Sequence, residues 1–215
     1  MAYNEYTMDS LETEFRIYTQ SDDHYAGIEP VAVTDWLRES VRLGLYRARG
    51  IGTEKARSEL LIMPVLVEAV ERCRDTATVF SGVDFPVDSS RGLRGVVDFL
   101  ISLSREQFVV RSPVIAIVEA KNENIKSGIA QCVAEMVAAR VFNRDRGSDL
   151  RTVFGVVTTG TDWQFMRLVD ETVYIEHNEY YLKEVEKVVA ILIAMIREAE
   201  AEVNGTSQCE GRPRQ

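Results

Sequence analysis

Cysteine and histidine are scarce in this chain of 215 residues. The three cysteines, Cys73, Cys132 and Cys209, form no Cys-x-x-Cys pair, so neither a disulfide framework nor a zinc site held by thiolates is indicated. The two histidines, His24 and His177, occur without a Gly-x-Ser-x-Gly motif, which argues against a serine hydrolase and against a histidine-rich metal site. We expect two cysteines in the core, one in the tail, and both histidines at the surface.

Long apolar runs are also missing. The run VVAILIAMI at 188–196 is much shorter than the roughly 20 residues that a membrane-spanning helix requires. The chain does not start with a basic segment followed by an apolar one, as a secretion signal would. We therefore expect a cytoplasmic protein without a membrane partner.

A hydrophobic content of 46% is sufficient to build the core of one domain at this chain length. The sequence predicts an acidic leader at 1–33 and one α/β domain at 34–203. The tail at 204–215 lacks large apolar residues and is predicted to be disordered, because nothing in it can offset the entropy of ordering.

Positive charge is in deficit, and the formal net charge is −9. Residues 1–35 hold eight acids and one base, a net charge of −7, which leaves −2 for the rest of the chain. Basic residues instead gather around the first strong helix, with few acids between them: Arg38, Arg42, Arg47, Arg49, Lys55 and Arg57. Such a cluster is usually a solvated helix face, and a phosphate-binding surface is the alternative.

Helical and strand patterns follow one another along the domain. Helices are predicted at 34–50 after the cap Thr34, and from the cap Thr53 to about residue 73 with a kink at Pro64. Strands are predicted at 78–85, 92–104 and 113–121, then a helix at 125–142, a strand at 151–160, a hairpin at 163–176 and a helix at 181–203. The helix at 125–142 would make the strands that flank it parallel. The sequence thus predicts an α/β sandwich with a mixed sheet.

Two predicted core strands carry carboxylates. Asp98 lies in GVVDFLI, and Glu119 lies near the end of PVIAIVEAK, where Lys121 follows on the same face. A lone carboxylate in an apolar strand costs several kcal/mol unless it is paired or binds a cation. One interpretation is a buried salt bridge with Lys121. The other is a Mg²⁺ site, with Mn²⁺ as a substitute, held by Asp98, Glu119 and the Ala120 carbonyl, where Lys121 orients an attacking water.

These residues resemble the motifs of the PD-(D/E)XK nuclease-like superfamily. Gly95-Val-Val-Asp98 is similar to its first acidic motif, without the proline that often precedes the aspartate, and Glu119-Ala120-Lys121 is similar to its (D/E)XK motif. The stretch ARSELLIMPVL looks like the N-terminal helix of type I restriction-enzyme nuclease domains. VVTTGTDWQFMRL looks like the closing strands of bacterial, notably cyanobacterial, members. The resemblance covers roughly residues 53–176.

The resemblance implies a restriction-endonuclease-like αβββαβ core, here with an N-terminal helical extension and a C-terminal helix. It implies Asp98, Glu119 and Lys121 as catalytic residues, with Gln131 on the following helix and Glu59 as a further metal-binding acid, for which Glu54 is the alternative. The function implied is a Mg²⁺-dependent endonuclease that acts on DNA. A noncatalytic DNA-binding or assembly subunit of the same fold, or a small-molecule-binding regulatory protein, is the alternative.

The C-terminal helix suggests a homodimer. It has an apolar stripe that is wider than one sheet face requires, which favours either a large core or a second chain. The residues are Leu182, Val185, Val188, Val189, Ile191, Leu192, Ile193, Met195 and Ile196.

Overall fold

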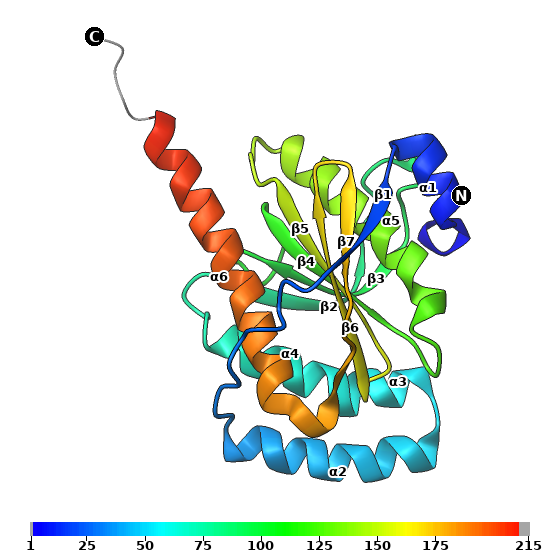
Figure 1. The fold of residues 1–215 in the computed structure, drawn as a ribbon, viewed down its shortest axis with the longest axis vertical. Helices are drawn as coiled ribbons and strands as arrows, with labels where there is room; N and C mark the ends of the chain where they lie inside the picture. The colour runs from blue at the N-terminus through cyan, green and yellow to red at the C-terminus, as the bar shows by residue number, and fades with distance from the viewer. Residues whose placement is uncertain (1, 211–215) are drawn as a thin grey trace.

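A mixed, open eight-stranded sheet runs through the computed structural model, which describes residues 2–210 (Figure 1). Its order is β1-β7-β6-β5-β4-β3-β2, and β8 pairs with β6. The strands are β1 (Tyr18–Asp22), β2 (Thr78–Asp84), β3 (Val96–Ser102), β4 (Val114–Ala120), β5 (Thr152–Thr158), β6 (Asp162–Val169), β7 (Thr172–Glu176) and β8 (Tyr180–Tyr181). The helices are α1 (Met8–Phe15), α2 (Asp35–Ile51), α3 (Glu54–Arg57), α4 (Met63–Glu71), α5 (Lys126–Arg144) and α6 (Val185–Glu210). Short helical turns are η1 (Tyr3–Glu5), η2 (Ser58–Ile62), η3 (Ser89–Arg91) and η4 (Leu182–Glu184).

The central strands follow the predicted order along the chain, and the two strands that flank α5 are parallel, as predicted. β2, β3 and β4 are antiparallel neighbours, and β4 and β5 are parallel because α5 carries the chain from one end of the sheet back to the other. Every residue of β4 is buried, as expected for a strand that has neighbours on both sides and helices on both faces. The α/β class and the mixed sheet are therefore confirmed.

Helices cover both faces of the sheet (Figure 1). One core contains side chains of α2, α4 and α6, together with one face of the central strands. The other core contains the leader, α5 and the opposite face of the same strands. The carboxylates of interest lie on the α5 face.

The helix before the sheet contains an irregular turn. Thr34 and Thr53 cap α2 and α3 through their side chains, as predicted. The π-helical turn η2 then separates α3 from α4, and the Met63 N–H reaches back to the Ser58 carbonyl. Pro64 has no N–H, so the helix cannot close its normal hydrogen bond to Leu60. The Leu60 carbonyl instead faces α2.

The acidic leader is an integral part of the domain rather than an appendage. β1 extends the sheet by pairing in parallel with β7, and Tyr3, Leu11 and Ile17 are buried in the core on the α5 side. The Tyr6 hydroxyl contacts Glu14 at 3.4 Å and also donates to the Arg91 carbonyl, which ties α1 to the β2–β3 connection.

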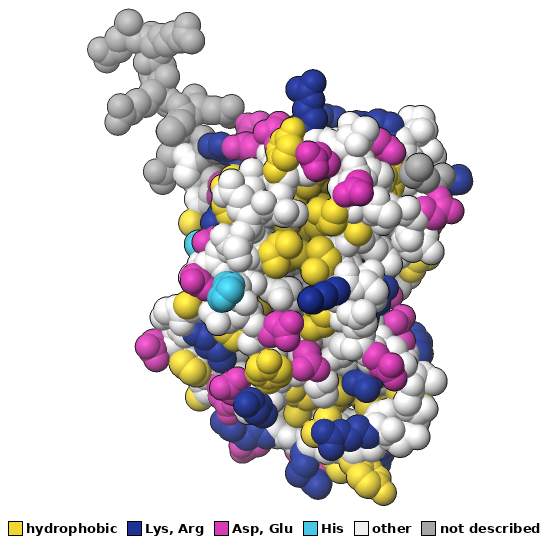
Figure 2. Space-filling view, turned by 45° about the vertical axis from the view of Figure 1, so that its right-hand side comes forward, with side chains coloured by type: hydrophobic (Ala, Val, Ile, Leu, Met, Phe, Trp, Pro, Cys, Tyr) yellow, Lys and Arg dark blue, Asp and Glu magenta, His cyan; other side chains and the backbone are white. Residues whose placement is uncertain are grey.

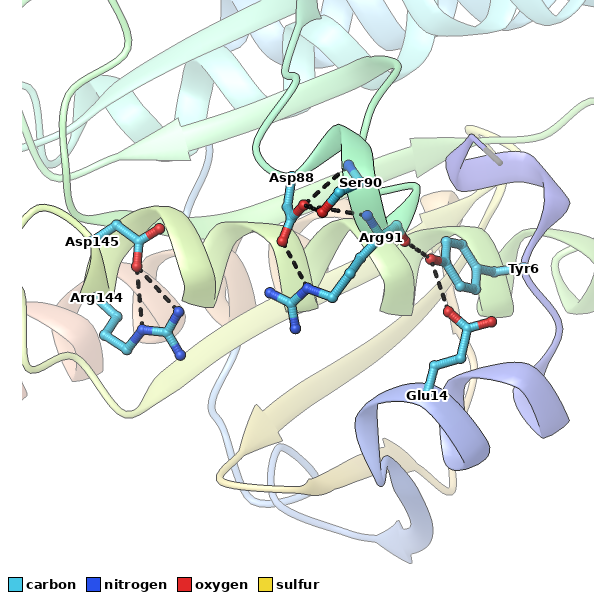
Figure 3. A network of polar contacts seen from close by, with 7 residues as sticks. All are labelled: Tyr6, Glu14, Asp88, Ser90, Arg91, Arg144 and Asp145. Atoms are coloured by element: carbon cyan, nitrogen blue, oxygen red, sulfur yellow. Dashed lines mark hydrogen bonds and ion pairs between the residues drawn. The ribbon is translucent and has the colours of Figure 1, made fainter.

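Figure 3 shows this network, in which Asp88 also pairs with Arg91 at 2.7 Å. The leader's acids lie at the surface, while its apolar residues enter the core. Its net charge alone therefore does not show that the leader is part of the domain. Deleting it would remove a strand and not merely charge.

The C-terminal helix is longer than predicted. α6 continues to Glu210 and so extends into the predicted tail, and residues 211–215 lie outside the described part of the chain. All nine apolar residues that suggested a dimer are buried within a single chain. The width of the stripe is therefore explained by the core alone, because α6 packs against α4 and the sheet together.

Several smaller expectations are confirmed. Cys73 and Cys132 are buried, whereas the side chain of Cys209 lies outside the described part of the structure. His24 and His177 are exposed. Trp163 and Phe165 of β6 are fully buried. Within residues 2–210, no helix is long and apolar enough to cross a membrane.

Candidate functional site

Asp98 and Glu119 lie on the same face of the sheet, as predicted. β3 and β4 pair with Phe99 opposite Val118, so one residue further Asp98 lies opposite Glu119. The Asp98 Oδ2 accepts a hydrogen bond of 2.9 Å from the Ala120 N–H. Glu119 is only 2% exposed, while Asp98 is partly exposed and opens the pair to solvent.

A chain of polar contacts continues from Glu119 into α5. The Lys121 ammonium lies 2.5 Å from the Glu119 Oε1 and donates to the Gln131 Oε1 at 3.1 Å. The Gln131 Nε2 donates in turn to the Glu135 Oε1 at 3.1 Å. Strand alternation places Glu119 and Lys121 on one side, and the helical spacing of four residues places Gln131 beside Glu135. The structure therefore brings the predicted Asp98, Glu119, Lys121 and Gln131 together.

Gly128 makes room for the lysine. It lies on α5 one turn before Gln131, and a Cβ added there would lie 3.0 Å from the Cγ and Cε atoms of Lys121 and 2.7 Å from the Val157 Cγ1. The aliphatic part of Lys121 thus passes directly over the helix backbone. Gly128 could not be identified from the sequence, because a glycine in a predicted helix carries no sign of what packs against it.

The electrostatics of the site favour retention of a proton. Burial, and next the charge of Asp98, raise the pKa of Glu119 to about 7, despite the opposing effect of Lys121. Burial and the charge of Glu119 raise the pKa of Glu135 well above the usual carboxyl range. Burial lowers the pKa of Lys121, but its hydrogen bond to Glu119 outweighs this, so the pKa is raised. The cluster holds more negative charge than its own donors neutralise.

Two carboxylate oxygens in this cluster have no hydrogen-bond partner. They are the Glu119 Oε2 and the Glu135 Oε2, both buried. An unsatisfied buried oxygen costs about 1–3 kcal/mol, so such atoms call for a ligand, a proton or a water.

The helix acid needs a correction. Glu59 was expected as the further metal-binding acid, but its side chain is 61% exposed and pairs with Lys55 at 3.2 Å. It lies in the π-helical turn η2, whose extra residue changes the direction of the side chains relative to a regular helix. Of the two helix acids, Glu54 is the one whose charge acts on the pKa values of Glu119 and Lys121.

Arg57 joins this helix to the motif. Its Nε donates to the Asn122 Oδ1 at 3.2 Å, and its guanidinium donates to the Thr159 carbonyl at 3.0 Å. Asn122 directly follows Lys121, so the basic cluster recognised in the sequence reaches the candidate site through Arg57. The sequence shows Arg57 as a member of that cluster but contains no sign of this contact.

The donor set fits a hard divalent cation in part. Asp98 and Glu119 present two carboxylates on one face, and the Glu119 Oε2 is free to act as an oxygen ligand. Across residues 2–210, however, no group of three or more His, Cys, Asp or Glu side chains is arranged to hold a metal ion. A cation here would have two carboxylate ligands and would take the others from backbone oxygen, water and substrate.

Comparisons with protein-family models, curated proteins and solved structures give no match to this chain. The function must therefore be inferred from the residues and their geometry.

Proposed function

We propose that the protein is a Mg²⁺-dependent endonuclease of the PD-(D/E)XK nuclease-like type, which hydrolyses phosphodiester bonds in DNA. One observation carries the proposal. Two carboxylates, Asp98 and Glu119, share one face of the sheet, and a buried oxygen of Glu119 has no partner while Lys121 lies against the other. A purely structural ion pair has no use for the second carboxylate or the open oxygen.

The arrangement of elements supports the finer fold assignment. The helical run α3–α4 precedes β2, β3 and β4, after which α5 leads to β5, which gives the order αβββαβ. The acidic motifs lie on β3 and β4, the two middle strands of the β5-β4-β3-β2 part of the sheet. β1, β6, β7, α1, α2 and α6 surround this core as additions.

Each residue has a distinct chemical role in this proposal. A divalent cation, when bound, supplies Lewis acidity and lowers the pKa of a water molecule. Asp98 and Glu119 would hold it, together with the Ala120 carbonyl. Lys121 stabilises negative charge that develops on the phosphate and orients the attacking water. Gln131 keeps the ammonium in place, because Glu135 takes its amide N–H and turns its oxygen toward Lys121.

A noncatalytic DNA-binding or assembly subunit is the second candidate. It is favoured by the contacts of Lys121, whose ammonium is held by both Glu119 and Gln131, as in a closed structural ion pair. Both candidate functions are compatible with a homodimer, but the apolar side of α6 gives no support for one because it is buried within its own chain.

Cleavage of DNA in the presence of Mg²⁺ or Mn²⁺ tests the proposal. The substrates are linear, nicked, branched and single-stranded DNA, each incubated with the wild type and with Asp98→Asn and Lys121→Met. We expect cleavage by the wild type but not by Asp98→Asn or Lys121→Met, and calorimetric binding of Mn²⁺ that Asp98→Asn removes. Asp145→Asn is the matched control, since it removes an exposed carboxylate beyond the far end of α5.

Cleavage that survives Asp98→Asn would reject the assigned site. Absence of both cleavage and Mn²⁺ binding, with DNA binding intact, would favour the noncatalytic subunit.

A further inference from the structure

Unpaired cations and exposed aromatic rings lie together at the end of α2 and on the nearby β8–η4 segment. Among the described residues, the side chains of Arg47 and Arg49 have no hydrogen bond or ion pair. Tyr46 beside them is 83% exposed. On the neighbouring segment the Lys183 ammonium lies 5.3 Å from the ring centre of Tyr181, a residue that is 39% exposed.

Figure 2 shows Lys and Arg side chains, with hydrophobic ones among them, at the lower end of the molecule, the end at which Figure 1 places α2.

Two surface hollows meet at Leu45 and Arg49. One, of about 660 Å³, lies along the last turns of α2 beside Tyr46 and Arg47. The other, of about 500 Å³, extends from Arg49 to the β8–η4 segment. The two hollows share these two lining residues, and we call them together the α2 groove.

The α2 groove is positively charged although the whole chain is acidic. Three cations line its second hollow: Arg49, Arg57 and Lys183. The acid there is Asp162, whose Oδ2 already accepts from the hydroxyls of Thr159 at 2.8 Å and Thr161 at 2.6 Å. With a formal net charge of −9 for the chain, a local excess of cations favours an anionic ligand at this place.

The groove leads to the candidate active site. Arg57 lines its inner wall and also donates to Asn122, the residue after Lys121. A polyanion that contacts Arg49 and Lys183 would therefore be directed toward the Asp98–Lys121 cluster.

We infer that the α2 groove binds a single-stranded nucleic-acid segment, with phosphates on Arg47, Arg49 and Lys183 and bases stacked on Tyr46 and Tyr181. This rests on the proposed function only in that the strand leads to the site of cleavage. The exposed rings favour a single strand, because the faces of paired bases are hidden in the stack whereas unpaired bases stack on aromatic side chains. The substrate class is then DNA with a single-stranded end or flank.

Fluorescence anisotropy in EDTA tests this, because binding is then measured without cleavage. The probes are labelled oligothymidine and a duplex of equal length. We expect tighter binding to oligothymidine. Arg49→Ala/Lys183→Ala should weaken it about tenfold and lower the slope of log affinity against log salt by about 1.4, since each single-strand phosphate contact contributes about 0.7. Tyr46→Ala should weaken binding of oligothymidine and leave the duplex unaffected.

The matched control is Arg74→Ala/Arg197→Ala, which removes the same charge from exposed positions beyond the end of α4 and on α6. Equal losses in both double variants, tighter binding of the duplex, or equally tight binding of a labelled polyglutamate of the same length would overturn the inference.

Failure of the groove and failure of the proposed function give different results. If Arg49→Ala/Lys183→Ala leaves oligothymidine binding unchanged while the wild type still cleaves DNA, the inferred role of the α2 groove is rejected and the proposed nuclease function is retained. If oligothymidine binding follows the predicted pattern but no substrate is cleaved, the inferred role of the α2 groove is retained and the proposed nuclease function is rejected.

Discussion

Glu68 and Glu119 are buried to nearly the same degree, with exposed fractions of 4% and 2%, yet their surroundings are opposite. Glu68 on α4 accepts from the Thr34 N–H at 3.1 Å, the Thr34 hydroxyl at 2.6 Å and Arg72 at 2.8 Å. Glu119 accepts from Lys121 alone, and its second oxygen has no partner.

The pKa values follow these contacts. Burial raises the pKa of Glu68, but its hydrogen bonds from Thr34 and Arg72 outweigh this and the net shift is downward. For Glu119, burial and the charge of Asp98 prevail and the shift is upward. Burial therefore does not identify a functional carboxylate. Glu68 has its donors within the fold and fixes the start of α2 to α4, whereas one oxygen of Glu119 has no donor in the described part of the chain.

The largest expected difference is in activity. Glu119→Gln should reduce DNA cleavage about 1,000-fold, the scale of removing one preorganised electrostatic group, while Glu68→Gln leaves the chemical step unchanged. Single-turnover rates at saturating DNA, measured below the unfolding temperature of each variant, compare the two. Equal losses would mean that Glu119 acts only through the fold.

For stability we expect the larger effect at Glu68 rather than at Glu119. Glu68→Ala removes the partner of Thr34 and leaves Arg72 without its carboxylate, so we expect a loss of about 3 kcal/mol in the free energy of unfolding. Urea unfolding at neutral pH measures it. Glu71→Ala, three residues along on the exposed side, is the control and should stay within about 0.5 kcal/mol of the wild type. A loss below about 1 kcal/mol would contradict the structural role of Glu68.

A glutamine at Glu135 should stabilise the protein. Because the pKa of Glu135 is raised, the folded chain holds a proton that the unfolded chain releases above the ordinary carboxyl pKa of about 4.3. Stability therefore falls as the pH rises from that value toward the raised pKa. Glu135→Gln removes this slope and should add about 2 kcal/mol at pH 8. Unfolding curves from pH 5 to pH 8 check it, and an unchanged slope would contradict the prediction.

The smallest expected effect concerns glycine. Gly128→Ala should cost about 1 kcal/mol, because its Cβ would displace Lys121 and Val157, whereas Gly50→Ala on α2 has open space and should stabilise by up to about 1 kcal/mol. Thermal unfolding of both variants measures this, and we expect a lower unfolding temperature for Gly128→Ala and a higher one for Gly50→Ala. If both stabilise, Lys121 adjusts freely and the close approach of α5 is not tight.

Much of the candidate site could be predicted from local patterns. The period of two along β4 placed Glu119 and Lys121 on one face, and the apolar neighbours showed that the face is buried. The spacing of four residues between Gln131 and Glu135 placed them side by side on one helix face.

The choice between Glu54 and Glu59 could not be made in this way, because it depends on a π-helical turn that the sequence pattern does not reveal. The leader was misjudged for a similar reason. Its acids dominate the count, but its pairing with β7 involves a strand about 150 residues away.

The sequence by itself determined the αβββαβ order of elements, the burial of β4 and the presence of a carboxylate on each of two neighbouring strands, because these depend on periods of two and 3.6 residues within short segments. Only the tertiary structure decided that Asp98 lies opposite Glu119, that Lys121 reaches Gln131 over Gly128, and that α6 is covered by its own chain. Strand register and helix docking are set by packing between segments far apart in the chain, and no local pattern contains that information.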